Sequence, residues 1–95
     1  MQMVWSAVAI KDREMIFDYI EADSFSAAVL VDGRIEAAVE LLADTPEIGR
    51  PGRVEGTREL MISRTQYIAA YTLAGNQVTI LRVLHGALVW PDVLG

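Results

Sequence analysis

Arginine side chains crowd into one stretch of an otherwise acidic chain. Residues 49–60, GRPGRVEGTREL, hold Arg50, Arg53 and Arg58, although the whole sequence has only eight lysines and arginines. Arginine presents a rigid fork of donors that suits phosphate or carboxylate, and it keeps its charge at ordinary pH. Together with Arg64 at the next turn, the stretch predicts a rim that binds an anion or a partner protein.

The charge of the chain, −5 overall, is unevenly distributed. Residues 1–48 carry three basic residues against ten carboxylates, or −7, whereas residues 49–95 carry five arginines against three carboxylates, or +2. This pattern excludes a uniformly basic nucleic-acid-binding protein but allows a local basic patch. Glu47, Glu55 and Glu59 are close enough in sequence to neutralise the rim, so a connector with no binding role is the alternative.

The apolar run Val78–Leu84 is interrupted by Arg82 and followed by His85. A charge within a buried strand has to be paired or has to face a groove. Arg82 therefore predicts either an ion pair with Glu59 on a neighbouring strand or a basic floor to a concave face of the sheet. A lone histidine beside Gly86 is more often a structural hydrogen-bonding residue than a proton shuttle.

Three aromatic residues accompany these charges. Tyr67 and Tyr71, four residues apart, share one face of a predicted strand, where packing explains them better than stacking on bases. Trp90, next to Pro91, is predicted to anchor the C-terminal segment on the domain. Its amphipathic ring also makes it a candidate contact for a partner.

Several common chemistries are excluded. One histidine and no cysteine cannot build a zinc site, and no carboxylates have the spacing of a calcium loop. No Lys-Ser or Lys-Thr follows the glycines of 49–56, as a phosphate-binding loop requires. No Ser-His-Asp arrangement is indicated. We therefore expect no metal and no cofactor.

Length and composition point to a single domain spanning residues 1–95. The absence of cysteine fits a reducing bacterial cytoplasm, and no apolar run approaches the roughly 20 residues of a membrane span. Hydrophobic residues make up 53% of the chain, an excess that fits either apolar surface covered by a partner or a core rich in alanine and valine.

The elements that position these residues follow from periodicity. Met3–Ser6 is predicted to be a strand that leads into a helix capped by Ser6, with Asp12 among the charged residues of its solvated face. Ser24 caps a second helix that runs to about Leu42. Its apolar stripe is expected at steps of three and four, on Ala28, Val31, Ile35, Ala38 and Leu42. Gly33 in its middle has no explanation beyond a possible close contact with the first helix.

After a turn-rich loop, Thr45–Thr57, the period changes to that of strands. Strands are predicted at Glu59–Ser63, Tyr67–Leu73 and Val78–His85, the last of them central in the sheet. A hairpin loop joins the second and third. The predicted fold is α+β: a strand, an antiparallel helical hairpin, then a three-stranded antiparallel meander, giving an antiparallel sheet backed by the hairpin.

Four segments carry a family resemblance. The runs PEIGRPGRVEGTREL (46–60), YIAAY (67–71) and ILRVLHGALVWP (80–91) resemble the RelE/ParE superfamily of bacterial toxins, and WSAVAIKDREMIFDYI (5–20) resembles its opening strand and first helix. The resemblance implies the same fold. It also implies the toxin half of a type II toxin–antitoxin pair, a growth inhibitor of the kind that stabilises plasmids, neutralised by an antitoxin that wraps around it.

Two branches of that superfamily imply different activities. RelE-type members cut messenger RNA on the ribosome with basic residues on the middle strands; here such a role would fall to Arg82, His85 and Arg58. The pattern departs from this branch at several positions where basic residues are usual: Glu59, Met61, Ile68, Gly86 and Ala87. ParE-type members lack that basic set and resemble protein-directed inhibitors of DNA gyrase.

The sequence therefore favours a ParE-like toxin that binds gyrase. A ribosome-dependent messenger-RNA endoribonuclease and an inactive relative are the alternatives. The expected partners are a cognate antitoxin, the gyrase or ribosome target, and operator DNA only through the antitoxin, with no membrane. The residues expected to meet the antitoxin or the target are Arg50, Arg53, Arg58, Arg64, Arg82 and Trp90.

Overall fold

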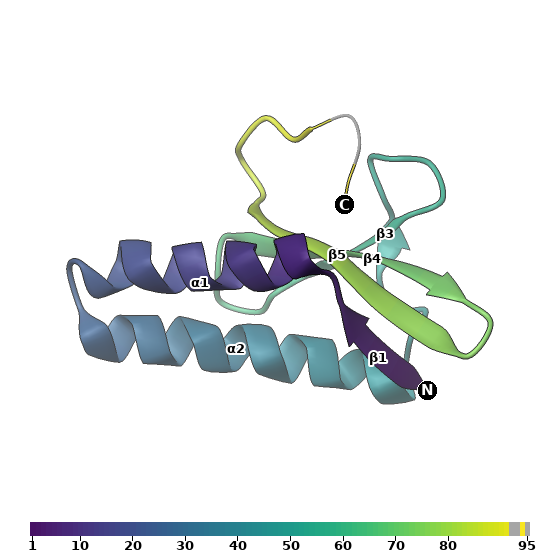
Figure 1. Ribbon diagram of the computed structural model, residues 1–95, viewed down its shortest axis with the longest axis horizontal. Coiled ribbons are helices and arrows are strands. Elements are labelled where there is room, and N and C mark those ends of the chain that lie inside the picture. The colour runs from purple at the N-terminus through teal and green to yellow at the C-terminus, as the bar shows by residue number, and fades with distance from the viewer. Residues whose placement is uncertain (92–93, 95) are drawn as a thin grey trace.

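The helices and strands form two layers. The computed structural model describes residues 1–91 and 94, and in Figure 1 a helical hairpin lies on one side of a sheet. In chain order the elements of the described residues are β1 (Gln2–Trp5), α1 (Ala7–Glu21), α2 (Phe25–Asp44), β2 (Arg50–Pro51), β3 (Arg58–Met61), β4 (Tyr67–Ala74) and β5 (Gln77–His85). The predicted α+β order is confirmed. The structure adds β2, a two-residue strand inside the stretch predicted to be a loop.

Both helices begin where the sequence predicts. The hydroxyl of Ser6 accepts a hydrogen bond from the Ala9 amide at 3.0 Å, and that of Ser24 accepts one from the Ala27 amide at 3.2 Å. Each cap satisfies one of the amide groups that the first turn of a helix leaves without a partner. The predicted apolar stripe of α2 is largely buried, with Val31 partly exposed. A side chain at Gly33, however, would meet nothing within 4 Å, so the suggested close contact is wrong.

The sheet is mixed, which corrects the expectation of an antiparallel sheet. Its strand order is β1-β5-β4-β3-β2, and β1 pairs parallel with β5 while every other pair of neighbours is antiparallel. Because the helical hairpin returns the chain across one face, β1 and the distant β5 end up side by side (Figure 1). The prediction that the last strand is central is confirmed.

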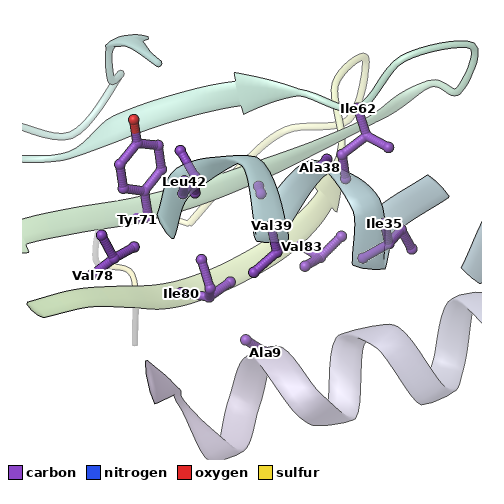
Figure 2. Packing of buried hydrophobic residues seen from close by; sticks show 11 residues of the cluster. Ala9, Ile35, Ala38, Val39, Leu42, Ile62, Tyr71, Val78, Ile80 and Val83 are labelled. Atoms are coloured by element: carbon purple, nitrogen blue, oxygen red, sulfur yellow. The ribbon is translucent and has the colours of Figure 1, made fainter. Parts of the chain in front are cut away.

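The core lies between α2 and the sheet. Figure 2 shows Ile35, Val39 and Leu42 of α2 facing the strands that carry Tyr71 and Ile80. All five side chains are buried. Burial of this apolar surface supplies most of the favourable free energy of folding.

Tyr71 also fixes the segment that precedes β2. Its hydroxyl donates to the Pro46 carbonyl at 2.7 Å and accepts from the Gly49 amide at 2.9 Å. A β-carbon at Gly49 would come within 2.5 Å of that hydroxyl, so only glycine fits without a shift of the ring. This segment is therefore held in place before the arginine-rich stretch begins. No helix of the described residues is long and apolar enough to cross a membrane.

Candidate partner-binding surfaces

Arg82 is paired with Asp12, not with Glu59. The Arg82 Nε donates to Asp12 Oδ2 at 2.7 Å, and Nη2 donates to Oδ1 at 2.9 Å. The hydrogen bond that Arg82 donates to Asp12 is the main cause of the raised pKa of the guanidinium, so Arg82 stays charged. The expected pair with Glu59 is wrong because a closer carboxylate, on the first helix, takes the position.

Asp12 is buried, contrary to the prediction that it lies on a solvated face. Strand β1 ends at Trp5, opposite Ile80, so the β1–β5 ladder does not continue along β5 as far as Val83. Asp12 closes part of the edge of β5, because its Oδ2 accepts the Val83 amide at 3.0 Å. The sequence held a signal for it: Asp12 follows the buried Ala9 by three residues and precedes Ile16 by four, which places it on the apolar side of the helix.

Glu59 is the second buried carboxylate, and it organises part of the arginine-rich stretch. Its side chain, 1% exposed, accepts from the Arg53 amide at 2.7 Å and from Arg50 Nη2 at 3.2 Å. The Arg53 Nε lies 3.6 Å from the same carboxylate. Two of the rim arginines therefore converge on one acid, as the alternative of local neutralisation anticipated for Glu59.

Arg58 bonds to backbone instead of presenting its charge to solvent. Its Nη1 donates to the carbonyl of Glu47 at 3.1 Å and to that of Gly49 at 2.9 Å. Glu47 therefore acts through its backbone and not through the carboxylate that the sequence suggested. Arg58 and the Tyr71 hydroxyl hold the same turn from two sides.

The C-terminal segment is anchored beyond the end of β5 (Figure 1). The indole of Trp90 donates to the His85 carbonyl at 3.0 Å, and the guanidinium carbon of Arg53 lies 3.9 Å from the centre of its ring. Arg53 Nη2 also donates to the Gly86 carbonyl. The predicted anchoring role of Trp90 is confirmed, and Arg53 is its partner.

His85 is a structural hydrogen-bonding residue, as expected. Its Nδ1 accepts from the Ala87 amide at 3.1 Å, so its Nε2 carries the proton and donates to the side-chain oxygen of Gln66. Tyr67 packs edge-on against the imidazole with ring centres 5.6 Å apart. Packing also explains the buried Tyr71, as predicted for both tyrosines.

Arg64 differs from the other predicted arginines. It is exposed, and its backbone has a left-handed φ of 60°, a conformation that side chains with a β-carbon rarely adopt. Arg34 Nη1 donates to its carbonyl at 3.1 Å, a contact that the sequence gave no reason to expect. Among the described residues, no acidic group pairs with the guanidinium of Arg64 or of Arg34.

Two apolar hollows flank the helical hairpin. The larger, about 550 Å³, lies between α1 and the end of β5 and is lined by Asp12, Met15, Ile16, Tyr19, Tyr67, Val83, Leu84, His85 and Leu88. Burial there raises the pKa of the Tyr67 hydroxyl, with a smaller contribution from Tyr19. The second, about 410 Å³, lies between α2 and β3 and is lined by Arg34, Ala37, Ala38, Leu41, Leu60, Met61, Ser63 and Arg64.

The six residues expected to meet a partner are thus dispersed. Arg50, Arg53 and Trp90 lie together around Glu59 and the C-terminal segment, while Arg58, Arg64 and Arg82 occupy three other places. Within the described part of the chain, no three His, Asp or Glu residues form a group suited to a metal ion.

Comparison with known proteins identifies the family. Residues 3–90 match the model described as the ParE toxin of the type II toxin–antitoxin system parDE. Y4kP, a toxin candidate of Sinorhizobium fredii, is 42% identical over 90 residues, covering 95% of this chain and 93% of the relative. Toxin RelE2 of Caulobacter vibrioides is 36% identical over 86 residues, covering 90% and 96%.

A solved structure agrees with the sequence match. A chain of the chromosomal ParDE toxin–antitoxin system from P. aeruginosa superposes with a TM-score of 0.77 at 28% identity, covering 87% of this chain and 92% of that one. The family model spans nearly the whole chain, and the fold built above is that of the solved relative. This chain belongs to the ParE family and is a toxin of a type II toxin–antitoxin system.

Proposed function

We propose that this toxin acts by binding a protein target, DNA gyrase, and not by cleaving RNA. The observation that carries the proposal is the engagement of Arg82, whose Nε and Nη2 both donate to the buried Asp12. A phosphate would have to displace a bidentate carboxylate to reach this cation. Cleavage of RNA by side chains alone depends on a cation that is available to the phosphate and on a poised acid and base. Because Arg82 is paired with Asp12, it does not supply an available cation.

The other two candidate catalytic residues support the same conclusion. His85 uses both ring nitrogens to hold Gln66 and the amide of Ala87. Arg58 Nη1 donates hydrogen bonds to two backbone carbonyls. Each residue already has a structural task, so a concerted attack on a phosphodiester would require several contacts to break at once.

The hollow between α1 and β5 is the surface we assign to the cognate antitoxin. Its lining exposes Met15 and Tyr19, 60% and 78% accessible, next to the partly buried Tyr67. Methionine and tyrosine provide adaptable apolar contact area, which is typical of protein-binding surfaces. The antitoxin neutralises the toxin in the bacterial cytoplasm by covering this hollow, and operator DNA is contacted through the antitoxin, because the toxin itself carries a net charge of −5.

The test sets gyrase against the ribosome. Purified toxin is expected to inhibit supercoiling of relaxed plasmid by gyrase, and addition of antitoxin should restore it. Ribosomes programmed with message should yield intact transcripts when 5′ ends are mapped. Site-specific cleavage that disappears in Arg82→Ala and His85→Ala would overturn the proposal in favour of the endoribonuclease, and induction without growth arrest would indicate an inactive relative.

The antitoxin surface has a separate test. Met15→Asp places a charge in the hollow and is expected to weaken antitoxin binding by at least about tenfold, because central apolar contacts dominate such interfaces. Leu30→Asp is the matched control, since Leu30 is 54% exposed on α2 and does not line the hollow. Equal loss of affinity in both variants would contradict the assignment.

A further inference from the structure

Methionine supplies all of the sulfur in this chain, which has four methionines and no cysteine. The thioether is therefore the side-chain group that hydrogen peroxide oxidises most readily here. Met61, at the end of β3, is the most exposed of the four at 63%, followed by Met15 at 60%, whereas Met3 packs against the core. An oxidant in solution should reach Met61 and Met15 well before Met3.

A charged donor lies against the sulfur of Met61. Arg50 Nη1 donates to its Sδ at 3.8 Å, while Nη2 of the same guanidinium donates to Glu59 at 3.2 Å. Arg50 stands opposite Glu59 in the β2–β3 ladder, and strand residues two apart point to the same side of a sheet. One guanidinium therefore spans Glu59 and Met61. Within the described part of the chain, the sulfur of Met15 has no such donor, although Met15 is almost equally exposed.

This arrangement suits an oxidised methionine better than a reduced one. A thioether is a weak hydrogen-bond acceptor, whereas oxidation makes the side chain polar by adding an oxygen to the sulfur. The 3.8 Å between Arg50 Nη1 and Sδ leaves room for that oxygen to accept the same N–H at the ordinary distance of about 2.9 Å, with a bend at the acceptor. Since the donor is charged, the new hydrogen bond is stronger than the one it replaces.

We propose that Met61 is a site of reversible oxidation by hydrogen peroxide, with Arg50 as the group that holds the product. The sulfur attacks one peroxide oxygen and gives up two electrons; the sulfur–oxygen bond forms as the oxygen–oxygen bond breaks. The departing hydroxide takes the proton left on the transferred oxygen and becomes water. The site exists whether or not gyrase is the target, so the proposal does not depend on the one above.

Reversal needs a second protein, because this chain has no thiol of its own. A methionine sulfoxide reductase supplies it: two thiols give two electrons, a disulfide forms, and the oxygen leaves as water. The exposure of Met61 at the surface leaves the sulfoxide open to such an enzyme.

Oxidation changes two features of the molecule at once. The guanidinium of Arg50 then bridges the Glu59 carboxylate and the sulfoxide through two charge-assisted hydrogen bonds, so residues 50–57 are held more firmly. The exposed end of Met61 also becomes polar within the hollow that it lines with Ala37 and Leu41. The toxin therefore has two surface states, which the oxidant and the reductase interconvert.

Mapping of the oxidised positions is the first test. Purified toxin is treated with hydrogen peroxide, digested at intervals and measured by mass spectrometry. Met61 and Met15 should be converted several times faster than Met3, and a thiol-dependent methionine sulfoxide reductase should return Met61 to the thioether. A Met61 that is oxidised no faster than Met3, or that the reductase does not restore, overturns the proposal.

A second test asks whether Arg50 holds the sulfoxide. Urea denaturation gives the folding equilibrium constant for Arg50 and for Arg50→Ala, before and after exposure to peroxide that converts Met61 and leaves Met3 intact. All forms carry Met15→Leu, which removes the other exposed thioether and keeps its apolar volume. Because the Arg50 side chain is 52% exposed, its truncation should leave the fold intact.

Oxidation should raise the folding constant of the Arg50 protein about threefold to tenfold relative to its effect on Arg50→Ala, as a charge-assisted hydrogen bond at a half-exposed position would. Amide hydrogen exchange of residues 50–57 should slow on oxidation only where Arg50 is present. The matched control is Met61→Leu, in which peroxide should act equally on both arginine forms. Equal effects of oxidation with and without Arg50, or an undiminished difference in Met61→Leu, overturns the proposal.

Discussion

The two buried carboxylates among the described residues of this toxin, Asp12 and Glu59, bind arginines at very different separations along the chain. Asp12 joins α1 to residues 70 and 71 positions further on, whereas Glu59 binds groups six and nine positions away. Both side chains of the Asp12–Arg82 pair are mostly buried, 10% and 20% exposed, while Arg50 and Arg53 around Glu59 are 52% and 40% exposed. The Asp12 carboxylate therefore joins the helical layer to the sheet, whereas the Glu59 carboxylate fixes the conformation of one loop.

Asp12→Asn should have the largest effect. It leaves Arg82 without a charge partner, and breaking a buried ion pair costs about 3–5 kcal/mol. We expect a fall of about 3 kcal/mol in the free energy of unfolding, since Arg82 keeps some access to water, measured by urea denaturation. The double variant Asp12→Asn/Arg82→Leu should recover much of that loss, because it removes both charges and keeps a side-chain oxygen that can accept the Val83 amide. A double variant no more stable than Asp12→Asn would show that the pair is not the cause.

Glu59→Gln should have a smaller and more local effect. Its partners Arg50 and Arg53 can turn to solvent, so we expect a loss of about 1 kcal/mol in global stability, typical of one hydrogen-bonded contact. Hydrogen exchange should quicken in residues 50–57 and stay unchanged in α1. A global loss as large as that of Asp12→Asn would erase the contrast between the two carboxylates.

Gly33→Ala tests the comparison with a substitution that is expected to stabilise the protein. Gly33 lies in α2 with open space around its α-carbon, so alanine should raise the free energy of unfolding by about 0.8–1 kcal/mol. Added to Glu59→Gln, it should restore most of the lost stability, but in Asp12→Asn it should restore only a part. Gly49→Ala is the matched control and should destabilise, because its new methyl group would meet the ring of Tyr71.

The smallest effect on stability is expected at alkaline pH, and it arises from a residue on the Asp12 side of the molecule. Burial raises the pKa of Tyr67 in the folded state above its ordinary value of about 10. The folded state therefore holds this proton longer, and the resulting stability is present below pH 10 and is lost as the pH rises through the folded-state pKa. Across this alkaline pH window, the melting temperature of Tyr67→Phe should fall less than that of the wild type. Parallel curves for the two proteins would contradict the assignment.

Local signals predicted much of the fold. Ser6 and Ser24 cap helices because their hydroxyls act within three residues, and the apolar stripe of α2 is a property of that helix alone. The central position of β5 followed from its apolar character. The parallel pairing of β1 and the strand β2 were missed, because a four-residue and a two-residue strand carry almost no pattern of their own.

The candidate surfaces were harder to predict than the fold. Sequence patterns identified arginines but not their partners, and the pairing of Arg82 depends on Asp12 being brought to the edge of β5 from 70 residues away. The resemblance supplied the family, which the comparisons confirm. Arg34 went unnoticed because its neighbour Arg64 is 30 residues distant and touches it only through a carbonyl.

Because the first strand pairs with the last, the sheet of this toxin cannot be completed until the last strand has been made. In the described sheet, β1 has β5 as its only strand neighbour, and Asp12 finds Arg82 on that same strand. A nascent chain releases its N-terminal end first, so both ends of these contacts coexist outside the ribosome only after β5 has been made. Until then the surface between α1 and β5, to which we assigned the antitoxin, does not exist, so an unfinished copy lacks that proposed binding site.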